Sequence, residues 1–167
     1  MLQVAAAYEE TIDPRELRRV LGSFATGVTV VTALDEFGQP RGMTANSFTS
    51  VSLQPPLVLV CVATGSLIWQ TFARARHFAV NVLSGHQRDL SKRFAERRPD
   101  RFEGVEWSPG VTGAPVLDSV LAHLECRRYR EVEAGDHMIL LGEVVSFDQD
   151  IHPPLVFHRG DYAMLAR

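Results

Sequence analysis

The sequence contains little cysteine and no metal-binding pattern. Its two cysteines, Cys61 and Cys126, lie far apart and form no CxxC pair. We expect both to be small buried thiols of a cytosolic protein, because stable disulfides belong mainly to oxidising compartments. The six histidines form neither an HExxH motif nor a ligand triad, so the sequence predicts no metal site.

Long apolar runs and dense basic tracts are also missing. The longest apolar runs have the length of a β-strand, well below the ~20 residues that span a membrane. The N-terminal segment lacks the basic start and the apolar centre of a secretion signal. Seventeen basic residues stand against 20 acidic ones, and the net charge of −3 does not attract a polyanion. We therefore expect a cytoplasmic protein that binds neither nucleic acid nor a membrane.

Several catalytic and nucleotide-binding motifs are absent too. No GxGxxG follows a strand-like run and no GxxxxGK[ST] occurs, so a bound nucleotide would use neither a Rossmann fold nor a P-loop. No GxSxG motif or paired-carboxylate pattern supports a hydrolase. Two alternatives follow from these residues alone. Either the protein binds a ligand without reaction, or a cofactor carries the chemistry.

The length predicts one domain, for which we expect residues 13–167 after a flexible N-terminal arm over residues 1–12. Asp13 and Pro14 form a typical helix start. Apolar residues at 17, 20, 21 and 24 follow with the spacing of one helical face. This pattern predicts a helix that Gly27 stops or that ends just before Gly27.

Two more helices are expected, both with an apolar side. The first covers residues 67–76 and would be capped by Ser66. The second covers residues 87–98, carries many charges, and places Leu90 and Phe94 inward. Residues 99–115 are rich in glycine, proline and charge, so we expect a long surface excursion there.

Most of the remaining chain has the pattern of strands joined by turns. The strand-like runs cover residues 28–34, 41–52, 57–62, 77–83, 121–132, 137–147 and 155–158. Pro55 and Pro56 impose an extended backbone before the run at 57–62, which is apolar throughout and predicted to be buried on both faces. Hairpin connections favour a mainly β, antiparallel barrel with a few helices over a doubly wound parallel sheet.

The stretch from Gly42 to Ala63 has the composition of a ligand-binding surface. It begins with small and hydroxyl side chains, and glycine and alanine leave the backbone accessible to a planar ligand. The hydroxyl groups of Ser47, Ser50 and Ser52 can donate hydrogen bonds to a phosphate. A polar edge strand that binds nothing is the alternative.

Three residues outside this stretch are further candidates. Arg93 on the charged helix suits a phosphate, and Phe94 beside it would supply an aromatic wall. His137 follows a Gly-Asp turn and opens an apolar strand, where its ring would point into a cavity. The alternatives are a solvated surface arginine and a histidine with a purely structural role.

Six segments in order resemble the short-chain flavin reductases, the small components of two-component flavin-dependent monooxygenases. These segments are LGSFATGVTVVTA, GMTANSFTSVSLQPPLVLVCV, HFAVNVLS, RF in the charged helix, GDHMILLGEV and PLVFHRGDY. The resemblance spans Asp13 to Met164. It implies an antiparallel, FMN-binding split β-barrel that binds FMN or FAD and is usually a homodimer.

The resemblance also implies roles for single residues in flavin and nicotinamide binding. Flavin should contact Pro40, Arg41, Gly42, Met43, Thr44, Asn46 and Ser47, with Ser50 and Ser52 near its phosphate. Cys61, Val62 and Ala63 should line the isoalloxazine, and Arg93 and Phe94 should close the phosphate end. The nicotinamide nucleotide, NADH or NADPH, should meet His158, Arg159, Gly160 and Asp161, with His137 near the nicotinamide as the catalytic residue.

The implied activity is that of an NAD(P)H:flavin oxidoreductase. Hydride would pass from nicotinamide C4 to flavin N5, and reduced flavin would leave for a separate monooxygenase. One departure is that Leu67 and Ile68 follow Ser66 where many relatives carry a small hydroxyl residue, which removes a polar contact to the flavin tail. A non-catalytic flavin- or haem-binding carrier or sensor on the same barrel is the alternative. A barrel for hydrophobic ligands without redox chemistry is a third.

Overall fold

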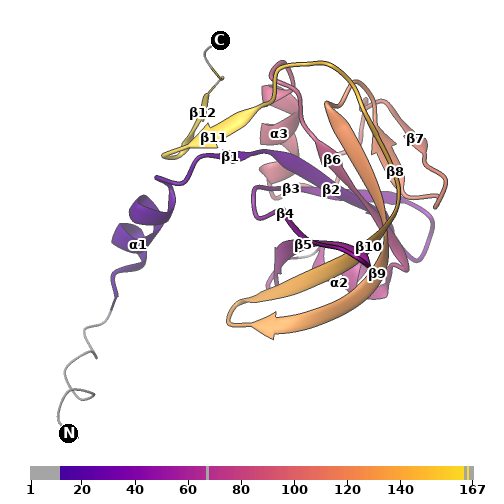
Figure 1. Ribbon diagram of the computed structural model, residues 1–167, viewed down its shortest axis with the longest axis horizontal. Coiled ribbons are helices and arrows are strands. Elements are labelled where there is room, and N and C mark those ends of the chain that lie inside the picture. The colour runs from indigo at the N-terminus through magenta and orange to yellow at the C-terminus, as the bar shows by residue number, and fades with distance from the viewer. Residues whose placement is uncertain (1–11, 67, 164, 166–167) are drawn as a thin grey trace, which may run out of the picture.

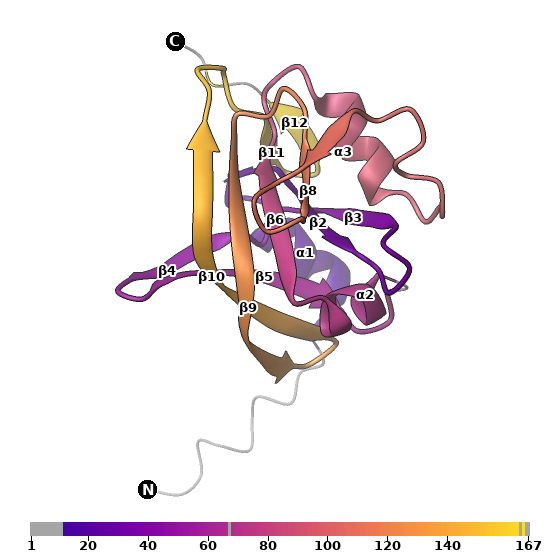
Figure 2. The same ribbon diagram turned by 90° about the vertical axis from the view of Figure 1, so that its right-hand side faces the viewer.

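The computed structural model describes residues 12–66, 68–163 and 165, and most of them belong to one curved antiparallel sheet (Figures 1 and 2). The strands of this sheet are β2 (Thr29–Leu34), β3 (Pro40–Ala45), β4 (Thr49–Leu53), β5 (Pro56–Ala63), β6 (His77–Val82), β9 (Ala122–Ala134) and β10 (His137–Gln149). They are arranged in the order β3-β2-β6-β9-β10-β5-β4. Every pairing is antiparallel, which confirms the predicted antiparallel, mainly β fold. Among the described residues no ladder joins the edge strands β3 and β4, so hydrogen bonds do not close the barrel.

Two small sheets and three helices complete the described chain. One small sheet contains β1 (Thr26–Gly27), β11 (Val156–His158) and β12 (Asp161–Ala163), and the other contains β7 (Trp107–Pro109) and β8 (Pro115–Leu117). The helices are α1 (Pro14–Leu21), α2 (Trp69–Arg74) and α3 (Arg88–Ala95). The expected arm over residues 1–12 lies outside the described residues except for Ile12.

Helix α1 starts as the sequence predicts and ends earlier. The carboxylate of Asp13 accepts a hydrogen bond from the Arg15 amide at 2.8 Å, which is a side-chain N-cap. Gly22 caps the other end, so Gly27 does not terminate the helix and belongs to β1 instead. No residue of α1 is buried, and Val20 and Leu21 are each 64% exposed. Figure 1 shows α1 standing away from the large sheet, so its predicted apolar side is not covered by that sheet.

The prediction of a single strand over residues 41–52 is wrong. The chain leaves the sheet at residues 46–48 and divides the run into β3 and β4, which lie at opposite edges of the seven-stranded sheet. Only the first part pairs with β2 in the predicted hairpin, with Thr32 opposite Gly42. The second part pairs with β5 in another hairpin, with Leu53 opposite Pro56. The chain crosses between the two edges because β3 pairs with β2 and β4 pairs with β5, and no local sequence pattern indicates these pairings.

Other differences concern burial and length. From Val58 onward β5 alternates between buried and half-buried residues, so it is not buried on both faces as predicted. The stretch 99–115 is not only a surface excursion, because it contains β7 and places Ala114 and Pro115 in the interior. Helix α2 is shorter than the expected 67–76, and residue 67 lies outside the described part of the chain. The expected hairpin at 121–147 is confirmed as β9 and β10.

Two apolar clusters form the core. The first fills the inside of the large sheet and includes Val60, Phe72, Phe78 and Leu140. The second lies beneath α3 and is centred on Phe94. As a result, α3 is attached firmly to β2 and β3, whereas α1 has no comparable attachment in the described chain.

Candidate functional site

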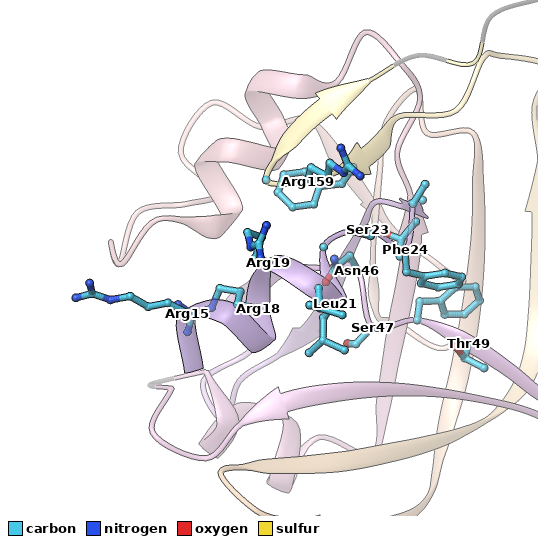
Figure 3. Close-up of a pocket in the computed structure, with 18 residues that line it drawn as sticks. Arg15, Arg18, Arg19, Leu21, Ser23, Phe24, Asn46, Ser47, Thr49 and Arg159 are labelled. Carbon is cyan, nitrogen blue, oxygen red and sulfur yellow. The ribbon is translucent and has the colours of Figure 1, made fainter. Parts of the chain in front are cut away.

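A wide hollow of about 1570 Å³ opens on the side of the molecule where β3 gives way to β4 (Figure 3). Its lining comes from residues 15 and 18–27 of α1 and β1, residues 46–49, and residues 157, 159 and 160 of the β11–β12 hairpin. Figure 3 shows Asn46 and Ser47 between α1 and β4, with Arg159 across the opening. The split of the predicted strand therefore creates the site, because the 46–49 connection forms part of its wall.

The connection is attached to β5 through Ser47. Its hydroxyl oxygen accepts a hydrogen bond from the Cys61 amide at 3.0 Å. Two residues further along β5, Ala63 pairs with His137 of β10. Asn46 remains exposed and lines the hollow. The connection, β5 and β10 are thus neighbours, but Cys61, Ala63 and His137 are not among the residues that line the hollow.

His137 carries its own orienting partner. Its Nδ1 lies 2.6 Å from Oδ1 of Asp136, and its side chain is 44% exposed. Because a carboxylate only accepts, Nδ1 carries the proton and Nε2 is the nitrogen left to meet a ligand. The hydrogen bond from His137, as the main cause, lowers the pKa of Asp136. Asp136 therefore stays ionised and fixes the orientation of the ring.

The turn at His158–Asp161 lies across the hollow from Asn46 and Ser47 (Figure 3). Arg159 and Gly160 both have positive φ, at 51° and 84°, and connect β11 directly to β12. The Arg159 amide donates to the carbonyl of Gly22 at 2.8 Å, which ties this turn to the end of α1. Arg159 and Gly160 line the hollow, whereas His158 and Asp161 form the adjacent strand pair.

Of the residues expected at the phosphate end, Arg93 and Phe94 belong to α3, whereas Ser50 and Ser52 lie on β4 at the other edge of the sheet. The Thr44 hydroxyl donates to the Ser91 carbonyl at 2.6 Å, and the Nε atom of Arg93 is buried without a partner among the described residues. Phe94 is only 1% exposed, so its ring supports β3 from within the core and offers no open wall. Gly42 packs directly on this ring, which explains its lack of a side chain.

Several other predicted contacts lie away from the hollow. Arg41 is paired with Asp35 at 2.8 Å, and Val62 is fully buried in the core. Pro40 and Met43 are half-buried in β3, and Met43 packs against the first core cluster. Ser50 is exposed on β4, and the Ser52 hydroxyl accepts from the Gln54 amide in the β4–β5 turn.

Sequence reasoning missed the contribution of α1 and β1. Arg15, Arg18 and Arg19 line the hollow, and the hydroxyl of Thr26 is buried there without a partner among the residues described. The spacing of apolar residues in α1 was visible, but no local signal indicated that its basic residues border a site. The aromatic rings of Phe24 and Phe157 were likewise missed as lining residues.

Two further properties concern the described residues as a whole. Within residues 12–66, 68–163 and 165, no three side chains of histidine, cysteine, aspartate or glutamate are grouped to hold a metal ion. None of the helices in this part of the chain is long and apolar enough to cross a membrane.

The curved antiparallel sheet and the hollow between the 46–49 connection and the β11–β12 hairpin form a candidate binding site on a β scaffold. Comparison with known proteins specifies the class. The chain belongs to the family described as "Flavin reductase like domain", whose model matches residues 21–166.

Named relatives agree with this family. A Rhizobium meliloti protein named "Probable flavin reductase" is 50% identical over 92% of this chain, but the chain spans only 49% of that protein. The reductase subunit HsaB of a flavin-dependent monooxygenase from Mycobacterium tuberculosis is 42% identical, with 90% of this chain and 82% of HsaB covered. The structure of the NADH:FAD oxidoreductase SgcE6 from Streptomyces globisporus, in complex with NAD and FAD fragments, matches with a TM-score of 0.87 at 44% identity. That match covers 94% of this chain and 97% of SgcE6.

Proposed function

We propose that this protein is an NAD(P)H-dependent flavin reductase that supplies reduced flavin to a separate monooxygenase. The observation that carries the proposal is the meeting of two distant segments at one hollow. Asn46 and Ser47 line one part of it, and Arg159 and Gly160 line another. Such an arrangement suits two flat ligands that must lie against each other. The names of HsaB and SgcE6 support the same activity, including the use of NADH and FAD by SgcE6.

The donors present in the chain fit a phosphate-bearing flavin. A buried polar atom without a partner is costly, and Arg93 and Thr26 each have one such atom. A phosphate or carbonyl oxygen of a ligand would complete their hydrogen bonding. We assign Arg93 to the flavin phosphate because its guanidinium group is always charged. Asn46 and the backbone around Ser47 would hold the ring.

Bound flavin would supply the hydride-accepting N5 atom, so the protein needs no acid or nucleophile of its own for that step. The chain's contribution is to hold two rings at reacting distance, which accounts for a large part of the barrier reduction in such reactions. The Ser47–Cys61 hydrogen bond keeps one wall of the hollow rigid. His137, oriented by its contact with Asp136, would offer Nε2 to a bound nicotinamide nucleotide.

We also infer a homodimer in the cytoplasm, with residues 13–167 as a single domain. The support for the dimer is the exposed apolar side of α1, where Leu17 is 44% exposed and does not line the hollow. The support for the compartment is the use of a reduced nicotinamide nucleotide together with two free thiols.

The proposal is tested by measuring NADH oxidation with and without added FMN or FAD. We expect a purified protein that is pale and strictly dependent on added flavin, because a shuttle must release its flavin. Absence of turnover with either flavin, with NADH and with NADPH, would favour the non-catalytic carrier. Flavin that stays bound through extensive dialysis would contradict the shuttle.

A second measurement tests His137. We expect His137→Ala to slow turnover and to leave flavin affinity unchanged, since the assigned role concerns only the nicotinamide. His123→Ala is the control, because His123 pairs with Asp148 at the opposite end of the β9–β10 ladder from His137. Unchanged turnover in the His137 variant would remove the role.

A further inference from the structure

Helix α3 connects the strand expected to hold flavin with the hairpin expected to hold the nicotinamide nucleotide. On one side, the Thr44 hydroxyl of β3 donates to the main-chain carbonyl of Ser91 at 2.6 Å. On the other side, the Ser91 hydroxyl lies 2.9 Å from the phenol oxygen of Tyr162 in β12. Ser91 is completely buried, so water does not compete for either hydrogen bond. One residue therefore joins both substrate-facing elements.

Tyr162 is held from three directions. The guanidinium carbon of Arg88 lies 5.2 Å from the centre of its ring, within the range of a cation–π contact. Phe157 of β11 packs edge-on against the same ring at 5.4 Å. The Tyr162 amide donates to Asp161 at 2.7 Å, and Arg88 reaches the same carboxylate oxygen at 3.2 Å. These contacts fix the β12 end of the turn on α3.

The turn itself requires such support. Arg159 adopts φ of +51°, a left-handed conformation that is unfavourable for a residue other than glycine. Such a conformation persists only where the surroundings hold it. Here the Arg159 amide is tied to Gly22 on one side, and Tyr162 is tied to α3 on the other. Loss of either hydrogen bond would allow the turn to leave this unfavourable backbone conformation.

We propose that Ser91 and Tyr162 are positioning residues that set the 158–161 turn against β3 and thereby determine capture of the nicotinamide nucleotide. This inference rests on the function proposed above. Neither side chain lines the hollow, so each acts through the turn and touches no substrate there. The Thr44 hydrogen bond uses the main chain of Ser91, so a change of the Ser91 side chain breaks only the link to the turn.

The test is a kinetic comparison of Tyr162→Phe and Ser91→Ala with the unchanged protein. Each variant removes one side of the same hydrogen bond, and we expect the KM for NADH to rise about three- to tenfold. We expect kcat to stay within about twofold and flavin affinity, measured by fluorescence titration, to be unchanged, since β3 is untouched. The double variant should be no worse than the more affected single variant, because both changes delete one shared bond. Tyr129→Phe is the control, because Tyr129 lies exposed on β9.

Three outcomes separate this inference from the proposed function. An active parent protein whose variants keep the KM for NADH would overturn the positioning role and leave the reductase assignment intact. A parallel loss of NADH and flavin affinity would also overturn it, because that pattern indicates general loosening of α3. A parent protein without NADH oxidation would remove the proposed function and this inference together.

Discussion

The packing around Gly42 determines what one added methyl group would do to β3. A Cβ atom at this position would lie 2.7 Å from Cε1 and 3.0 Å from Cδ1 of Phe94, and 3.2 Å from Phe102. Phe94 is 1% exposed and belongs to the second core cluster, so its ring has no open space into which it can turn. Gly42→Ala therefore forces β3 and α3 apart.

The expected loss of stability is about 1–2 kcal/mol. Overpacking a well-filled core costs ~1–3 kcal/mol. Replacing glycine by alanine within a strand offsets about 0.5–1 kcal/mol of this, because the unfolded chain loses freedom. Urea denaturation at equilibrium measures the change in the free energy of unfolding. Gly65→Ala is the matched control, since nothing lies within 4 Å of a Cβ added there.

A second variant tests the stated cause. Phe94→Leu makes room beside residue 42, so the double variant should lose less stability than the sum of the two single changes. Unchanged stability of Gly42→Ala, combined with a tenfold or greater loss of flavin affinity, would refute the packing argument. That result would mean that Gly42 serves the approach of a ligand to the backbone, as the sequence first suggested.

Three more predictions follow from single contacts. Arg93→Ala should weaken flavin binding by about ten- to a hundredfold in a fluorescence titration, while Arg97→Ala, at an exposed position after α3, should not. Burial alone would raise the pKa of Glu125, but hydrogen bonds from the 111–112 loop lower it overall. The ionised Glu125 side chain therefore stabilises the folded protein at pH values above the pKa of the unfolded state, and this stabilisation is lost as the pH falls toward the pKa of the folded state. Urea denaturation between about pH 5 and 3 should thus show a steeper loss of stability in the parent than in Glu125→Gln. Leu17→Asp, at an exposed position of α1 that does not line the hollow, should shift the proposed homodimer toward monomer in sedimentation experiments, because burying a leucine side chain is worth ~1.5 kcal/mol or more per chain.

Elements with a strong local pattern were predictable from the sequence. The N-cap at Asp13 and the β9–β10 hairpin agree with the structure because turn chemistry and periodicity act over a few residues. The antiparallel fold class followed from the hairpins for the same reason. Helix ends were less accurate, since Gly22 caps α1 five residues before Gly27.

Features that depend on distant partners were not predictable. Nothing within residues 41–52 indicates that its first half pairs with β2 and its second half with β5. The helical spacing predicted that Phe94 faces inward, whereas the family resemblance assigned it to the wall of a ligand site. The structure agrees with the first prediction, because Phe94 is buried in the core. The role of α1 beside the hollow depends on tertiary placement alone.

The break between β3 and β4, which the sequence did not predict, also explains how the site is formed. If residues 41–52 continued as one strand, Asn46 and Ser47 would take part in a regular ladder and their main chain would be occupied. Because the chain leaves β3 at Ala45 and joins β4 at Thr49, Asn46 stays exposed, and the Ser47 hydroxyl takes over the link to β5. A break between two sheet edges therefore frees polar groups for a ligand, while α3 keeps β3 in place from behind.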